Sequence, residues 1–374
     1  MKKACYIFII IAAVFFSCNS EKQGSIAFNI VKIDSLSIYF PDTIPMKDVP
    51  RSWNYHDSVF SYLMDNQNSI IFYEYNIYTG KWHVLAMQKE GNNGLLNSGQ
   101  YETLKTGKLI YFPKYTNKIF LIDPETGEIL KTFTISGDLG VYHSKNFNIR
   151  LQGNELIMPV FSKRRVDREY FQNNKLFAVF QMGSQDLQSI VNYPEDYLEL
   201  HAPASANIGS EFFFRGDSII YCFPRDKHVY VFDLSSYKTT KLKLENPHLQ
   251  FSGAILNENP YTVAVKRELE GKYSLLLNDT VSGLIYRISV YYPRYKNKLP
   301  RDQEELSRMF QSRKINIMTL NNSFEVIANS DLEGITDALF FINENGLYMR
   351  SMFETENEYR FIRLGMRKKK ESER

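Results

Sequence analysis

Lysine and arginine side chains recur in several turns of this chain and could bind an anion. Arginine offers a planar fork of N–H donors that suits carboxylate, sulfate or phosphate groups, and the face of a tyrosine ring suits a sugar ring. Loops are commonly charged, so the alternative is that these side chains are only solvated. The residues that we predict to bind a ligand are Tyr111, Lys114, Tyr115, Lys163, Arg164, Arg165, Arg168, Tyr170, Arg225, Lys266 and Arg267.

Cys18 could carry a different chemistry, because it stands at the end of an apolar N-terminal segment. Lys2 and Lys3 give this segment a positive start, and residues 6–16 are apolar without a break. The run is too short for a membrane-spanning helix, which needs about 20 residues, and it suits a secretory signal. The Ser17-Cys18 junction resembles a bacterial lipobox, in which the signal is cut before the cysteine and the thiol is acylated. We therefore predict a lipoprotein signal peptide over residues 1–17 and a membrane anchor at Cys18, the alternative being an ordinary signal with an incidental cysteine.

The other cysteines predict neither a disulfide nor a nucleophile. Cys5 leaves with the predicted signal, so Cys222 is the one cysteine that remains beside Cys18. It stands in the strand-like apolar run 219–223, where a free cysteine packs like a small apolar residue. We expect Cys222 to be buried.

No further set of residues predicts a catalytic, metal or cofactor site. Glu195, Asp196, Glu199 and His201 lack the spacing of a metal motif, and we interpret them as a solvated loop. Arg215-Gly216-Asp217 matches an adhesion tripeptide, but Gly-Asp between two apolar runs predicts a hairpin turn. We assign no catalytic residues, no metal and no cofactor.

The charge balance argues against nucleic acid as a partner. The chain has 45 Lys and Arg against 42 Asp and Glu, whereas a nucleic-acid-binding protein needs a strong basic excess. Much of the small surplus lies in residues 367–374, which we predict to be a basic, disordered tail. The alternative for this tail is contact with membrane headgroups.

A recurring hairpin predicts the elements that position these residues. Aromatic-rich strands run through a short turn into a second strand, and the copies begin at Ile71, Ile119, Leu176, Val229, Tyr273 and Leu347. Such a period is typical of a β-propeller, whose four-stranded blades cannot bury their own faces. We predict an all-β propeller of six blades over residues 49–366. Residues 315–327 are expected to supply outer strands of the last blade, or a seventh blade.

Three segments add detail to this architecture. Residues 18–48 are predicted as a lipid-anchored tether with one strand, Leu36–Phe40, which pairs with the last blade and closes the ring. Tyr261–Lys266 is predicted as a strand of the fifth blade. Around residues 300–311 a proline, early acidic residues and an apolar stripe at helical spacing predict one short helical insertion.

The hairpins also assign the two faces of the propeller. If the turns near residues 77, 125 and 236 join outer strands, then the preceding turns lie on the opposite face, where propellers usually bind ligands. Those preceding turns carry the basic and tyrosine residues named above. The sequence therefore predicts a ligand site on one rim.

The chain resembles lipoproteins of Bacteroides-type bacteria described as six-bladed β-propellers or as domains of unknown function. The resemblance is carried by the Ser17-Cys18 junction, by the run 111–123 and by the closing run 343–348. It implies an outer-membrane lipoprotein that faces the periplasm or the cell surface, and it implies no activity.

We predict a monomeric, lipid-anchored, non-catalytic β-propeller that binds a ligand or a protein partner at its funnel face. The ligand class that the basic residues favour is an anionic glycan. The alternatives are a glycan lyase or hydrolase that acts on acidic sugars, and a scaffold within a complex of the cell envelope.

Overall fold

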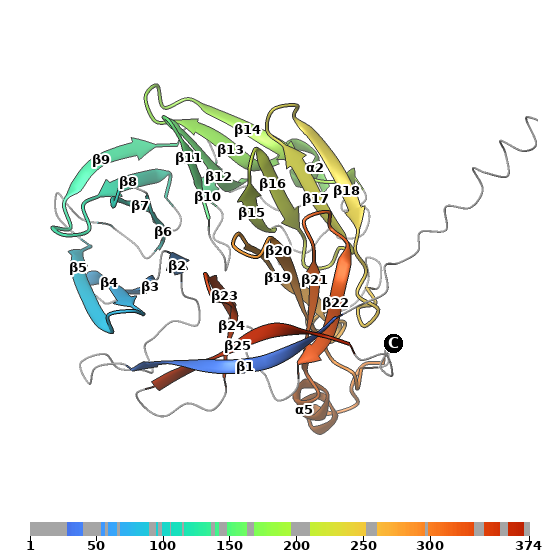
Figure 1. Ribbon diagram of the computed structural model, residues 1–374. Coiled ribbons are helices and arrows are strands. Elements are labelled where there is room, and N and C mark those ends of the chain that lie inside the picture. Colours follow the sequence, from blue (N-terminus) through green and yellow to red (C-terminus); the bar gives the residue numbers. More distant parts are fainter. Residues whose placement is uncertain are drawn as a thin grey trace, which may run out of the picture.

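The chain folds into antiparallel β-sheets that follow one another around a common centre (Figure 1). The computed structural model describes residues 28–369 without the segments 40–53, 57–58, 66–67, 90–94, 96–98, 105, 114–115, 136–138, 142–147, 163–167, 196–209, 252–259, 296–297, 333–339 and 352–357. The predicted all-β class is confirmed. The predicted signal peptide and Cys18 lie outside the described residues, and the predicted domain boundaries stay predictions.

The first four sheets each use consecutive strands. Their last strands β5, β9 and β18 are mostly exposed, so these strands form outer edges. The bounds are β2 (Asn54–His56), β3 (Val59–Asp65), β4 (Ser69–Asn76) and β5 (Lys81–Gln88); β6 (Gly99–Thr103), β7 (Leu109–Pro113), β8 (Lys118–Ile122) and β9 (Ile129–Thr134); β10 (Leu139–Val141), β11 (Arg150–Gln152), β12 (Glu155–Ser162), β13 (Lys175–Gln181) and β14 (Leu187–Asn192); β15 (Glu211–Arg215), β16 (Ser218–Cys222), β17 (His228–Asp233) and β18 (Lys238–Lys243).

The last sheet has eight strands in the order β19-β20-β21-β22-β1-β25-β24-β23. Its halves meet where β1 and β22 pair in parallel, with Phe28 opposite Ala328. The predicted pairing of the early strand with the last strands is confirmed, because β1 pairs with β25 along its length. The bounds are β1 (Phe28–Tyr39), β19 (Lys272–Asp279), β20 (Leu284–Tyr291), β21 (Lys314–Leu320), β22 (Val326–Leu332), β23 (Phe340–Asn343), β24 (Gly346–Arg350) and β25 (Glu358–Lys368).

The described helices lie in connections between strands. They are α2 (Arg168–Asn173), α4 (Pro260–Leu269) and α5 (Gln303–Gln311). The predicted insertion is confirmed as α5, which begins after Asp302, whose carboxylate accepts a hydrogen bond from the Glu305 amide at 2.8 Å. Such a cap satisfies one of the amide groups that the first turn of a helix leaves without a partner.

One turn type explains why the hairpin recurs in the sequence. The residue that ends the strand is Asn76, Asp123, Asp233 or Asp279, and its side chain accepts a hydrogen bond from the amide two residues later. Its carbonyl accepts from the amide four residues later. That later residue has a positive φ and is Gly80, Gly127, Tyr237 or Gly283. Glycine is favoured there because it lacks a Cβ.

Two expectations about strands were wrong. Tyr261–Lys266 is part of helix α4, which starts at Pro260 and ends at Leu269, two residues before Gly271 with φ +78°. Proline in a first turn and glycine after a last turn are helix boundaries, and here they outweigh the β-branched residues between them. Residues 315–327 belong to β21 and β22, which continue from β20 rather than from the last strands, so they form neither outer strands of the last blade nor a separate blade.

Buried apolar clusters lie between successive sheets. For example, Phe177 of β13 packs against Phe212 of β15 with ring centroids 4.9 Å apart. The last sheet also packs on the first, because Phe60 of β3 contacts Phe341 and Phe361. Burial between neighbouring sheets therefore continues around the ring, with Cys222 buried among them as predicted.

Candidate functional site

A pocket of about 480 Å³ lies where four connections of the fourth and last sheets meet. One wall comes from the segment after β18, with His248 and Gln250, and a second from the end of α4, with Leu269 and Glu270. The end of β20 and the start of β21 complete it, and the remaining lining residues are Tyr291, Tyr292, Pro293, Tyr295 and Lys314. This mixture of aromatic rings with a few polar groups is typical of small-molecule sites, as is the volume.

His248 and Tyr291 stack face to face in the pocket wall, so each ring covers one face of the other. Their ring centroids are 4.5 Å apart and their planes differ by 7°. The Tyr291 hydroxyl donates to Asp331 Oδ2 at 2.6 Å. Burial, followed by the hydrogen bond and charge of Asp331, raises the pKa of Tyr291, so this hydroxyl stays a donor.

A buried polar chain holds this wall in place. Asn316 donates to Asp331 Oδ1 at 3.0 Å and accepts a hydrogen bond from Asn246 at 2.9 Å. Asn246 also donates to Ser289 Oγ and accepts from the His248 amide at 2.9 Å. Because Asn246, Ser289 and Asn316 are buried, this chain fixes the segment that presents His248.

Tyr292 is fixed by a second set of charges. Its hydroxyl donates to Glu268 Oε1 at 3.1 Å, and Lys272 lies 2.9 Å from the other Glu268 oxygen. Burial opposes ionisation of Glu268, but the hydrogen bond and charge of Lys272 and the Tyr292 hydroxyl together lower its pKa. Glu268 is therefore a carboxylate at neutral pH, and it orients Tyr292.

Arg225 lies directly behind the pocket as the partner of Glu270. The guanidinium forms an ion pair with Glu270 Oε2, and the two side chains are 5% and 1% exposed. It also donates to the Arg267 carbonyl at 3.1 Å and lies 5.0 Å from the centroid of the Phe251 ring. Glu270 thus contributes little net negative charge to the pocket.

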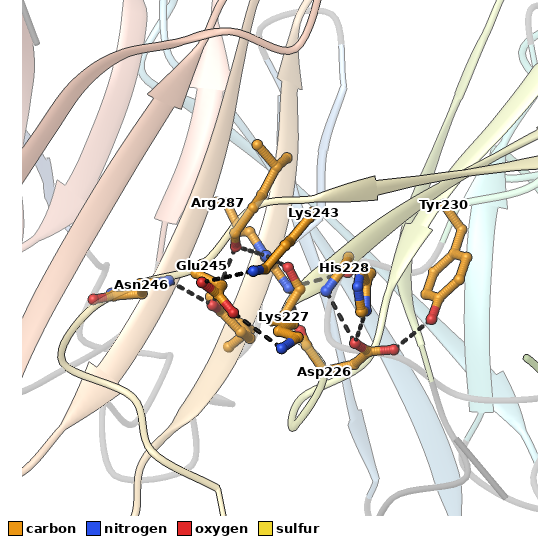
Figure 2. A network of polar contacts seen from close by, with 10 residues as sticks. Asp226, Lys227, His228, Tyr230, Lys243, Glu245, Asn246 and Arg287 are labelled. Atoms are coloured by element: carbon orange, nitrogen blue, oxygen red, sulfur yellow. Dashed lines mark hydrogen bonds and ion pairs between the residues drawn. The ribbon is translucent and has the colours of Figure 1, made fainter. Parts of the chain in front are cut away.

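Arg287 joins the fourth sheet to the last one (Figure 2). Its guanidinium donates to the carbonyls of Leu244 and Asp226 at 2.5 Å and to those of Lys227 and His228 at 3.1 Å. It lies 3.3 Å from the centroid of the Tyr273 ring. These contacts fix both the turn after β16 and the end of β18, and so the two segments that carry Arg225 and His248.

Asp226 accepts hydrogen bonds from two side chains in the same turn (Figure 2). His228 Nδ1 lies 2.7 Å from Oδ1, and the Tyr230 hydroxyl donates to Oδ2 at 2.6 Å. Oδ1 also accepts from the His228 amide at 2.9 Å. The amide contact identifies a side-chain-capped turn, so we assign this cluster a structural role.

The structure places the predicted ligand residues apart. Tyr111 is 0% exposed in the core between the first two sheets, and Tyr170 of α2 is 3% exposed between the third and fourth. Lys266 and Arg267 are half-buried in the last turn of α4. Among the described members of this set, Arg225 and Arg267 lie in contact, because the Arg225 guanidinium donates to the Arg267 carbonyl. Cys18, Lys114, Tyr115, Lys163, Arg164 and Arg165 lie outside the described residues, and Arg168 begins α2 with its side chain outside them.

Sequence reasoning did not find the residues of the pocket, although a signal was present. Tyr292-Pro293-Arg294 follows the strand β20, just as Phe223-Pro224-Arg225 follows β16 and Phe112-Pro113-Lys114 ends β7. In each case an aromatic residue, a proline and a basic residue end the second strand of a unit. The third copy was missed because β20 was expected to be a later strand of its blade.

The described residues contain no group of three or more His, Cys, Asp or Glu side chains that could hold a metal ion.

Cys222 is buried, and burial raises its thiol pKa to about 12. A thiol with so high a pKa is a poor nucleophile at neutral pH. In the described part of the chain, no helix is both long and apolar enough to cross a membrane.

A model of the family "Domain of unknown function (DUF4221)" matches residues 27–312. No curated protein matches the chain. Among solved structures, the chain is similar to a member of the DUF4221 family from Bacteroides vulgatus, with 14% identity, a TM-score of 0.70, and coverage of 93% of this chain and 100% of that one.

Two further structures are more distant. A candidate exported protein from Bacteroides fragilis has 10% identity and a TM-score of 0.55, with 94% of this chain and 98% of that chain covered. The WD40 domain of coronin from Toxoplasma gondii has 8% identity and a TM-score of 0.44, with 93% and 88% covered. At these identities the first likeness concerns the fold alone, and the second is too low to support an argument.

Proposed function

The chain belongs to the DUF4221 family, a domain of unknown function, and from its sequence and the geometry of its pocket we propose that it is a lipid-anchored, six-bladed β-propeller that binds an acidic carbohydrate. The site is the pocket lined by His248, Tyr291 and Lys314. The observation that carries the proposal is the His248–Tyr291 surface beside a lysine.

The sheet order supports the propeller. If the eight-stranded sheet is divided where β22 meets β1, its halves are four-stranded units that follow the four earlier sheets. Each unit packs on the next, and the last packs on the first. Supplying the outer strand of the last unit from β1 would close the ring and protect the edges that an open array exposes.

The pocket supports a sugar as the ligand class. The stacked rings of His248 and Tyr291 offer an apolar surface, and the hydrogen bonds to Asp331 and Asn246 keep both residues in position. Gln250 and Tyr295 also line the space and can exchange hydrogen bonds with hydroxyl groups. A rigid, partly apolar wall with nearby polar groups fits a sugar ring, which has both kinds of surface.

The charges of the pocket favour an acidic sugar. Glu270 is paired with Arg225 behind the wall, whereas Lys314 lines the pocket as its one lysine among the described lining residues. A carboxylate or sulfate on the ligand would form a charge-assisted hydrogen bond with this ammonium group.

The test is binding of the purified chain to an array of acidic and neutral polysaccharides, followed by calorimetry on any ligand found. We expect binding to at least one acidic polysaccharide. Lys314→Met should weaken that binding by more than about tenfold, since a hydrogen bond to a charged group contributes roughly 1.5–3 kcal/mol.

Lys238→Met is the matched control, because Lys238 is an exposed lysine of β18 that does not line the pocket. It should bind as the natural chain does. Failure to bind any acidic polysaccharide, or equal binding by Lys314→Met, would contradict the proposal. Shortened products in the same incubations would favour the alternative of a glycan lyase or hydrolase.

The lipid anchor rests on the sequence and on the place where the described fold begins. Cys18 follows the apolar run of the signal, and β1 starts at Phe28, so a short tether separates the predicted anchor from the fold. The name of the Bacteroides fragilis relative, a candidate exported protein, agrees with a secretory signal.

A further inference from the structure

The two ends of the described chain lie at the same end of two neighbouring strands in the middle of the eight-stranded sheet. β1 and β25 are antiparallel and lie side by side (Figure 1), with Phe28 opposite Lys368 and Asn29 opposite Arg367. The start of β1 therefore meets the end of β25. The chain that precedes Phe28 and the chain that follows Lys368 emerge at one place.

This place combines cations with exposed apolar side chains. Arg367 and Lys368 are exposed, and Lys369 follows them. Met366 is 36% exposed, and Ile33, which lies against Gly365, is 55% exposed. Basic side chains next to apolar ones suit the surface of an anionic membrane, where the cations meet headgroups and the apolar groups enter the interface. We call Ile33, Met366, Arg367, Lys368 and Lys369 the terminal edge.

The terminal edge and the pocket lie on neighbouring strands of the eight-stranded sheet, toward opposite ends of those strands. The pocket residue Lys314 begins β21 opposite Tyr291, and Ile315 pairs with Leu332. Phe28 pairs with Ala328, which pairs with Thr319 near the other end of β21. Because β1 is parallel to β22, the chain before Phe28 leaves away from the pocket. Lys314 and Thr319 are about 17 Å apart along a strand.

We propose that the terminal edge binds anionic lipid headgroups and so turns the pocket away from the bilayer. The proposal rests on the lipid anchor of the proposed function. Phe28 is ten residues after Cys18, and such a tether reaches at most about 35 Å. An acylated Cys18 would thus hold the terminal edge close to the membrane, where three adjacent cations add a second, electrostatic attachment.

The test uses the full chain with Cys18→Ala, which removes the acyl group, and vesicles of phosphatidylcholine with and without phosphatidylglycerol. Sedimentation should show binding to the anionic vesicles that weakens as salt is added. Arg367→Glu, Lys368→Glu and Lys369→Glu together should weaken the binding about 100-fold or more, because each basic residue near an anionic surface contributes roughly fivefold.

The control carries Lys81→Glu, Lys118→Glu and Lys131→Glu, which make the same change in net charge on exposed residues of β5, β8 and β9. It should retain the binding. Equal loss in both triple variants, or no loss in either, would overturn the terminal edge as a specific surface. All variants keep the same N-terminal segment, so any contribution from the uncut signal cancels.

A second measurement tests the orientation. In a chain with Cys5→Ala and Cys18→Ala, an environment-sensitive dye is attached at Lys369→Cys or at Lys298→Cys, which lies on the pocket side between β20 and α5. Anionic vesicles should shift the emission of the dye at position 369 and leave that at 298 unchanged. A shift at 298 alone would reverse the orientation. Retention of Cys18→Ala in cell membranes that have been washed with high salt, which releases electrostatically bound protein, would contradict the anchor, while the vesicle comparison still decides the terminal edge.

Discussion

Arg225 stands two residues after Phe223 in a turn, and in the sequence it looks like a solvent-facing cation. In the fold its guanidinium is enclosed by Glu270, the Arg267 carbonyl and the ring of Phe251. The carboxylate partner is 45 residues away along the chain. Residue type and local spacing contain no information about such a partner, so the burial of Arg225 could not be predicted from the sequence.

Removing one partner of this ion pair should destabilise the fold strongly. Arg225→Met would leave the Glu270 carboxylate buried without its cation, and we expect a loss of about 3 kcal/mol in the free energy of unfolding. Glu270→Gln should cost a similar amount, and the double variant should cost less than the sum of the two. Urea titrations of the four proteins measure these values.

Lys243→Met provides the control, because the ion pair of Lys243 with Glu245 is exposed at the surface. It should change stability by less than about 0.5 kcal/mol. Strictly additive effects of the Arg225 and Glu270 substitutions would show that the two side chains do not interact.

Glu102 of β6 predicts a pH dependence of stability. Burial raises its pKa to about 8, whereas an unfolded glutamate has a pKa of about 4.3. Between these values the folded chain holds a proton that the unfolded chain has released, so the contribution of Glu102 to stability falls as the pH rises through this window. Relative to Glu102→Gln, the natural chain should lose on the order of 2 kcal/mol between pH 5 and pH 9.

Urea midpoints at pH 5, 7 and 9 measure this difference. The exposed residue Glu125 supplies the control, because Glu125→Gln should follow the natural chain at each pH. Parallel pH profiles for the natural chain and Glu102→Gln would mean that Glu102 is ionised in the fold without cost.

At the scale of elements, the hairpins were predictable because their turns are local. An Asn or Asp at the strand end and a glycine four residues later specify the turn within a few residues, as at Asn76 and Gly80. The position of a hairpin within its sheet is not local. The copies at Ile71 and Val229 join the last two strands of a sheet, whereas the copy at Tyr273 joins the first two strands of its unit. Because the hairpin at Tyr273 holds a different position within its unit from the others, β21 and β22 were assigned to the wrong unit.

β1 should be essential for the last sheet. Ile38 of β1 is 0% exposed and packs with Phe60, Tyr348 and Phe361, which come from both sides of the contact between the first and last sheets. Ile38→Ala should therefore cost about 3 kcal/mol in the free energy of unfolding, the usual range for such a cavity being 2–5 kcal/mol. Thermal and urea unfolding measure it.

The neighbouring Tyr39 is a matched control. Its side chain is 63% exposed, and its backbone carbonyl accepts a hydrogen bond from Trp82 Nε1 at 3.2 Å. Tyr39→Ala should stay within about 0.5 kcal/mol of the natural chain. If Ile38→Ala is equally mild, β1 does not contribute to the core between the first and last sheets.

For the molecule as a whole, the recurring hairpin was enough to predict an all-β chain, and the resemblance of the runs 111–123 and 343–348 pointed to the Bacteroides domain-of-unknown-function kind. The pocket was not predictable, because it combines His248 and Glu270, which lie on either side of α4, with Tyr291 at the end of β20 and Lys314 at the start of β21. Only the packing of the fourth sheet on the last one brings these segments together, through contacts such as those of Arg287. A binding site assembled from distant segments has no single signature, and the repeated motif at Tyr292-Pro293 marks only one part of this pocket.

In the lipid anchor that we propose, firm attachment of the whole molecule to a membrane would depend on the sulfur of Cys18. Acylation of this thiol, with more than one chain, would hold the protein firmly, whereas the described fold offers only the weaker charged surface at its terminal edge. Cys18→Ala should therefore move the protein from the membrane fraction to the soluble fraction of cells that process the signal.

Cys222→Ala is the matched control, because it removes a thiol that is buried in the core and cannot be acylated there. The Cys222→Ala protein should remain in the membrane fraction in the same amount as the natural chain, with a modest loss of stability. Release of both variants would point to misfolding rather than to a lost anchor, and retention of Cys18→Ala would contradict the lipoprotein proposal.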